Sequence, residues 1–159
     1  MNQTSGLHER LRFLADVVSR EAQHLAQTDQ RLFGPGFGLA EAAHLASNAE
    51  LGERVDAFVA RFGRLQDTLA GALLPRLLEA LLEPVGSVLD NLNRAERLGW
   101  IRSASDWAEL RLLRNRMVHE YVREAQDLVD ALQAAHAGVI DLTAAASVLA
   151  ERARSAAPV

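Results

Sequence analysis

The sequence predicts an all-α bundle of four to six helices in an up-and-down arrangement. Apolar residues recur at intervals of three and four along most of the chain, a spacing that places them on one face of a helix. No stretch alternates apolar and polar residues as a half-buried β-strand would. A chain of 159 residues without cysteine has the length of one domain whose core needs no disulfide. We therefore expect one domain over residues 1–152 and a flexible tail at 153–159.

The first half of the chain predicts three helices, over residues 5–30, 39–47 and 51–73. The glycine-rich segment Gly34–Gly38 separates the first two as a loop. Pro75, with Gly71 before it, should kink or split the third helix, because a proline lacks the backbone N–H and clashes with the preceding turn.

After Pro75 the apolar face resumes over residues 77–82, and Pro84 and Gly86 interrupt it. A short segment over residues 88–98 then leads to the next helix, which is expected to run to about Arg123. Ser103 or Ser105 is its expected N-cap, because a serine side chain accepts a hydrogen bond from the first turn.

The last helix carries a regular apolar stripe. Its members are Leu128, Leu132, Ala135, Val139, Leu142, Ala146 and Leu149. This four-three spacing is typical of a seam within a bundle or across a dimer. A glycine inside a helix costs about 1 kcal/mol relative to alanine, so Gly138 predicts a close helix contact at that point.

Charge is distributed unevenly along the chain. The net charge is −4, and all 17 basic residues are arginines. Residues 94–123 hold seven arginines against four acidic residues, or +3, which leaves −7 for the rest. A local basic stretch in an acidic protein fits one anionic ligand site rather than general coating of nucleic acid. The alternative is an ordinary solvated helix face.

The sequence lacks the residue patterns typical of metal sites, transmembrane helices and signal peptides. The five histidines form no pair at i,i+3 or i,i+4, so we expect no metal ion and no cofactor. There is no uninterrupted run of 18 apolar residues, and residues 1–12 are polar, so we expect no transmembrane helix, no signal peptide and a cytoplasmic location. His136, beside the last apolar stripe, is expected in a packing role, and Trp100 and Trp107 are expected to be buried.

One segment gathers groups that suit phosphate chemistry. Within eight positions lie Arg114, Asn115, His119 and Tyr121, the only tyrosine. Arginine forks onto phosphate oxygens, and histidine exchanges a proton near neutral pH. The combination suits transesterification of an RNA phosphodiester, which needs a base for the 2′-hydroxyl and a cation for the charged transition state.

Helix geometry favours a dimer for this chemistry. On one continuous helix, Arg114 and His119 would lie roughly 140° apart, whereas Asn115 and His119, at i,i+4, would share a face. Two copies facing each other across a two-fold axis would bring both residue types into one cleft. The alternative is that Arg114 and His119 pair with neighbouring helices in a purely structural role.

The segment from Arg114 to Tyr121 resembles the Arg-x4-His-x-Tyr signature of the HEPN superfamily of α-helical domains. More narrowly, it is similar to the HepT toxins encoded beside minimal nucleotidyltransferase antitoxins. The resemblance in detail covers about residues 91–122, and the rest agrees only in helical character. The Gly34–Gly38 loop and the extended C-terminal part depart from the compact toxins.

The resemblance implies a function and a set of roles. Arg114 and His119 would be the catalytic pair of a metal-independent endoribonuclease toxin at a homodimer interface, with Asn115 as an accessory polar residue. Tyr121 would be the hydroxyl that a cognate nucleotidyltransferase antitoxin modifies with AMP. The substrate would be RNA, with tRNA as a candidate. Arg111 and Arg116 are further candidates for binding RNA phosphates.

Two alternatives stay open. The segment Asp90–Trp100 is also similar to HEPN proteins that serve as substrate-binding subunits of nucleotidyltransferases, in which the arginine and histidine bind rather than cleave. The second alternative is a dimeric helical scaffold in which the motif is structural.

Overall fold

The computed structural model describes residues 3–118 and 123–159, and no strand occurs among them. The predicted all-α class is confirmed. The elements are α1 (Gln3–Phe33), α2 (Leu39–Ala43), a 3₁₀ turn (Leu45–Ser47), α3 (Ala49–Thr68), a π-helical turn (Leu69–Leu73), α4 (Leu74–Ala80), α5 (Val88–Arg97), α6 (Ala104–Arg116) and α7 (Ala125–Ala156).

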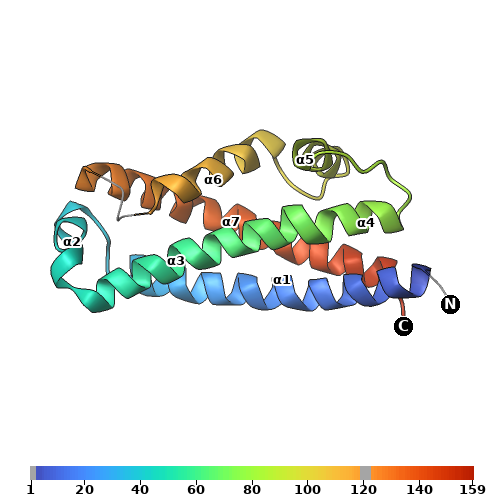
Figure 1. The fold of residues 1–159 in the computed structure, drawn as a ribbon, viewed down its shortest axis with the longest axis horizontal. Helices are drawn as coiled ribbons and strands as arrows, with labels where there is room; N and C mark the ends of the chain where they lie inside the picture. The colour runs from blue at the N-terminus through green and yellow to red at the C-terminus, as the bar shows by residue number, and fades with distance from the viewer. Residues whose placement is uncertain (1–2, 119–122) are drawn as a thin grey trace.

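The helices form an elongated bundle (Figure 1). Four lengths of chain lie along its axis and alternate in direction: α1, α3 continued by α4, α6, and α7. The helix α2 closes one end, and α5 crosses the other end and is seen end-on in the view. Both termini lie at the end that carries α5. The predicted up-and-down order therefore holds for the four long segments.

The core lies where α1 packs against α7 and α3. Phe58 and Phe62 of α3 are fully buried, and the ring of Phe33 at the end of α1 meets Phe58 edge-on, with ring centroids 5.2 Å apart. Every residue of the apolar stripe predicted for the last helix is buried in α7. The helical periodicity thus identified the faces that make the core.

The predicted break at Pro75 is a change of helix type. The chain widens into the π-helical turn at Leu69–Leu73, and α4 then begins with Pro75 in its first turn. The N–H of Leu74 donates to the carbonyl oxygen of Leu69, five residues earlier. A wide turn absorbs the proline ring, which an unbroken α-helix would drive into the preceding turn.

The close contact predicted at Gly138 is also confirmed. A Cβ placed on Gly138 would lie 2.5 Å from the Cδ2 of Leu110 on α6. Because carbon atoms in contact prefer about 3.5–4.0 Å, the side chain of Leu110 occupies space that is open only because residue 138 lacks a side chain.

The last helix bears on the membrane prediction. By length and composition alone, α7 is long and apolar enough to cross a membrane. The expectation of no transmembrane helix rests on the absence of an uninterrupted apolar run, and polar residues do interrupt the sequence of α7. Core helices of bundles pass the same test, and thirteen residues of α7 are buried here, chiefly against α1.

The C-terminal boundary differs from the expected tail at 153–159. The helix α7 continues to Ala156, and Ala153 and Ala157 are buried. Arg12 of α1 donates from Nη1 to the carbonyl oxygens of Ala157 (3.0 Å) and Pro158 (3.2 Å). The alanines of this segment, from which we predict a flexible tail, instead pack near the start of α1.

Candidate functional site

The candidate site lies where the end of α6 meets α3. Ser103 is the N-cap of α6, since its hydroxyl accepts from the N–H of Asp106 at 3.1 Å, which resolves the predicted choice between two serines. The helix ends at Arg116, with Met117 as its C-cap. Two arginines in the last turn, Arg114 and Arg116, complement the negative end of the helix dipole.

This end corrects the prediction of one helix to about Arg123. The geometry expected from a continuous helix, including a shared face for Asn115 and His119, does not apply, because α6 stops before His119. The sequence has no glycine or proline at this point, but Val118 and the residues after it include several weak helix formers. His119 and Tyr121 lie outside the described residues.

Arg114 packs along α3. Its Nη1 donates to Oδ2 of Asp67 at 2.6 Å, and its side chain is 47% exposed. A Cβ on Gly63 would lie 2.7 Å from Nε and 2.9 Å from Cζ of Arg114. The guanidinium therefore lies directly against the backbone of α3. Neither Gly63 nor Asp67 is among the residues predicted from the sequence. The cost of a glycine inside a helix, which indicates a close contact at Gly138, is the signal that could have found Gly63, whereas an exposed aspartate carries no such signal.

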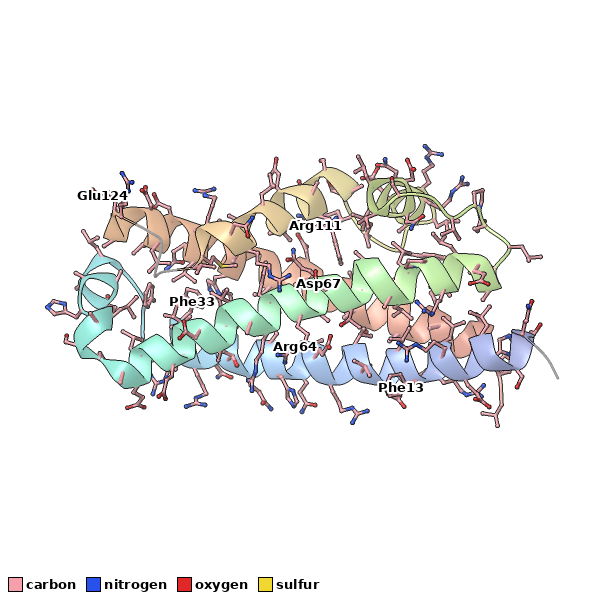
Figure 2. The ribbon with its side chains drawn as sticks, in the orientation of Figure 1. Phe13, Phe33, Arg64, Asp67, Arg111 and Glu124 are labelled. Carbon is pink, nitrogen blue, oxygen red and sulfur yellow. The ribbon has the colours of Figure 1, made fainter. Side chains whose placement is uncertain are left out.

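The other predicted residues of α6 are exposed. At 100° per residue, Arg111, Arg114 and Asn115 fall within about 100° of one another, whereas Arg116 lies about 140° from Arg111. In Figure 2, Asp67 lies on α3 along the edge beneath α6, where Arg111 is labelled. The helix therefore gathers Arg111, Arg114 and Asn115 on one side of α6 and places Arg116 away from Arg111 and Arg114.

A second polar cluster lies on the α1 side of α3. Thr68 donates from its hydroxyl to Oε1 of Glu21 at 3.1 Å, and Oε2 of Glu21 is buried without a hydrogen-bond partner among the described residues. Burial raises the pKa of the Glu21 carboxyl above its ordinary value, while the Thr68 hydrogen bond and the charge of Arg64 oppose the shift. Asp67 also acts on Glu21 electrostatically, so the cluster adjoins the Arg114 ion pair.

The remaining predictions about single residues concern packing. His136 binds Asp29 from Nδ1 at 2.7 Å and stacks on Phe33, with ring centroids 4.2 Å apart, which confirms its packing role. Trp100 and Trp107 are buried, 6% and 3% exposed, as expected. Within residues 3–118 and 123–159, no three His, Asp or Glu side chains converge as ligands for a metal ion.

No family model, curated protein or solved structure matches this chain. The relation to HEPN domains therefore stays a prediction from the residues between Arg114 and Tyr121. What the fold contributes is a placement for the first of these residues, at the end of α6 and against α3.

Proposed function

We propose that the chain is a HEPN-like, metal-independent endoribonuclease toxin that acts in the cytoplasm as a homodimer. The proposal rests on the position and exposure of the Arg114 side chain. Its guanidinium is held against α3, half-exposed, five residues before the one histidine of the motif. A fixed but accessible guanidinium is suited to binding phosphate oxygens in a fork.

The proposed reaction is a transesterification within RNA. Neutral His119 takes the proton of a 2′-hydroxyl, the 2′-oxygen forms a bond to phosphorus, and the bond from phosphorus to the 5′-oxygen breaks. The imidazolium then returns the proton to the departing 5′-oxygen. Arg114 stabilises the negative charge that builds on the phosphate oxygens. Asn115 and Arg111, on the same side of α6, would hold the RNA strand.

The homodimer is proposed through the outer face of α6. Leu112 is 69% exposed there, and Ala108, one turn earlier, lies on the same side. A two-fold axis at the C-terminal end of this face would bring the motif segments of two copies toward one cleft, with Arg114 itself about 160° from Leu112 around the helix and on the side of α3.

Control by a nucleotidyltransferase partner is proposed at Tyr121. Transfer of AMP from ATP to the phenol oxygen releases pyrophosphate and leaves a negatively charged phosphodiester with a bulky adenosine. That phosphate, seven residues from Arg114, would compete with the substrate phosphate for the guanidinium.

The test is cleavage of total RNA and of tRNA in excess EDTA by wild type, His119→Ala and His8→Ala. His8 lies near the start of α1 and serves as the matched histidine control. We expect wild type and His8→Ala to cleave and His119→Ala to be inactive. The mass of each protein shows whether Tyr121 carries AMP, and Tyr121→Phe supplies material that carries none there. Absence of cleavage by unmodified wild type and by Tyr121→Phe would overturn the nuclease and favour the substrate-binding subunit.

A further inference from the structure

We propose that Gly63 and Asp67 of α3 form a seat that fixes the guanidinium of Arg114, and that both are positioning residues for the ribonuclease. The inference rests on the proposed function. It adds two residues from a helix more than 40 positions away in the sequence.

Gly63 makes room for the guanidinium. The three atoms nearest to a Cβ built on Gly63 all belong to Arg114: Nε at 2.7 Å, Cζ at 2.9 Å and Cδ at 3.1 Å. Real Cβ atoms essentially never approach heavy atoms within 3.0 Å, so any side chain at this position would displace the arginine. A glycine inside a helix costs about 1 kcal/mol relative to alanine. The space at Gly63 is the physical gain that offsets this cost.

Asp67 fixes the direction of the guanidinium. It follows Gly63 by four residues and lies on the same face of α3, where its Oδ2 accepts from Nη1 of Arg114 at 2.6 Å. The backbone at Gly63 supports the Nε edge and Asp67 holds one Nη. Two points of contact orient a planar group that carries five N–H donors, and the 47% exposure of the side chain leaves donors accessible to a phosphate.

The Asp67–Arg114 ion pair contributes little to the stability of the fold. Both side chains are about half-exposed, 59% for Asp67 and 47% for Arg114, and exposed ion pairs contribute only about 0–1 kcal/mol. The consequence of the pair is geometric. A displacement of about 1 Å in a group that positions or stabilises the reacting atoms can reduce a rate by about 100-fold.

The test compares Gly63→Ala with Gly52→Ala. Both glycines lie in α3, so both substitutions raise helix propensity. A Cβ on Gly52 meets only the carbonyl oxygen of Leu45, at 3.8 Å. Because the atoms displaced by Gly63→Ala are the end of a flexible side chain, we expect that variant to fold and its arginine to move.

The first readout is independent of activity. In ¹⁵N–¹H NMR spectra, the Nε–Hε resonance of Arg114, assigned by its loss in Arg114→Lys, should shift in Gly63→Ala and Asp67→Asn and stay in place in Gly52→Ala. An unchanged resonance in Gly63→Ala would overturn the seat.

The second readout is cleavage of a short RNA by the same proteins. We expect kcat to fall at least tenfold in Gly63→Ala and Asp67→Asn with KM within about twofold, because an interaction made in the transition state affects kcat. Asp67→Glu should recover part of the loss, and Gly52→Ala should match wild type. A wild-type rate in Gly63→Ala, or a higher rate in Asp67→Asn, would overturn the positioning role. If wild type itself cleaves no RNA while the resonance shifts as expected, the proposed function fails and the seat stands as a structural contact only.

Discussion

The helices α7 and α6 differ in how much of their sequence is buried within the chain. The helix α7 buries thirteen of its 32 residues in a regular stripe, and that stripe explains most of its sequence. The helix α6 buries three of 13 residues and exposes Leu112 together with three arginines. Packing within the chain explains most of α7 and a smaller part of α6. Because α6 carries the motif arginine, half-exposed and held by α3, it is the helix where we expect a ligand or partner.

The largest expected effect tests this contrast with one leucine from each helix. Leu142→Ala should lower the free energy of unfolding by about 2–5 kcal/mol, because it leaves a cavity in a fully buried position of α7. Leu112→Ala should change it by less than about 0.5 kcal/mol, because that side chain is mostly exposed. Urea denaturation at a fixed protein concentration measures both. Equal losses in the two variants would contradict the contrast.

An intermediate effect is expected where the two helices touch. Gly138→Ala raises the helix propensity of α7 by about 1 kcal/mol, yet its Cβ would overlap Leu110, and overpacking costs about 1–3 kcal/mol. We expect a net loss of about 1 kcal/mol. In the double variant Gly138→Ala/Leu110→Ala the overlap is removed. Its loss of unfolding free energy should therefore be smaller than the sum of the losses in the two single variants, a difference that a double-mutant cycle measures. Additive effects would show that α6 does not depend on this glycine.

The smallest expected effect concerns α3, which contacts both helices. The folded protein holds the proton of Glu21 more tightly than the unfolded chain does, because burial raises the pKa of this carboxyl above 4.5. The free energy of unfolding should therefore fall as pH rises from about 4.5 through the raised pKa. Glu21→Gln, which does not ionise, should remove this part of the pH dependence.

Urea midpoints between pH 4 and pH 8 measure the effect of Glu21. Glu9→Gln, on an exposed position of the same helix, is the control and should follow wild type. Parallel curves for wild type and Glu21→Gln would show that the buried carboxyl does not couple to folding.

Features that are local or periodic could be predicted from the amino-acid sequence. The stripe of α7, the break at Pro75 and the close approach at Gly138 follow from helix geometry and backbone chemistry, which act within a few residues. The predicted end of this helix at about Arg123 is wrong, because α6 ends at Arg116 and several residues of weak helix propensity follow Met117.

Contacts between residues far apart in the sequence could not be predicted in this way. Arg114 reaches Asp67 and Thr68 reaches Glu21, each across 47 positions of sequence. In the sequence Gly63 is only an unfavourable residue in a helix, and its use becomes visible when the guanidinium is found in the space beside it. Such contacts depend on the angles and distances at which helices pack, which no local sequence pattern encodes.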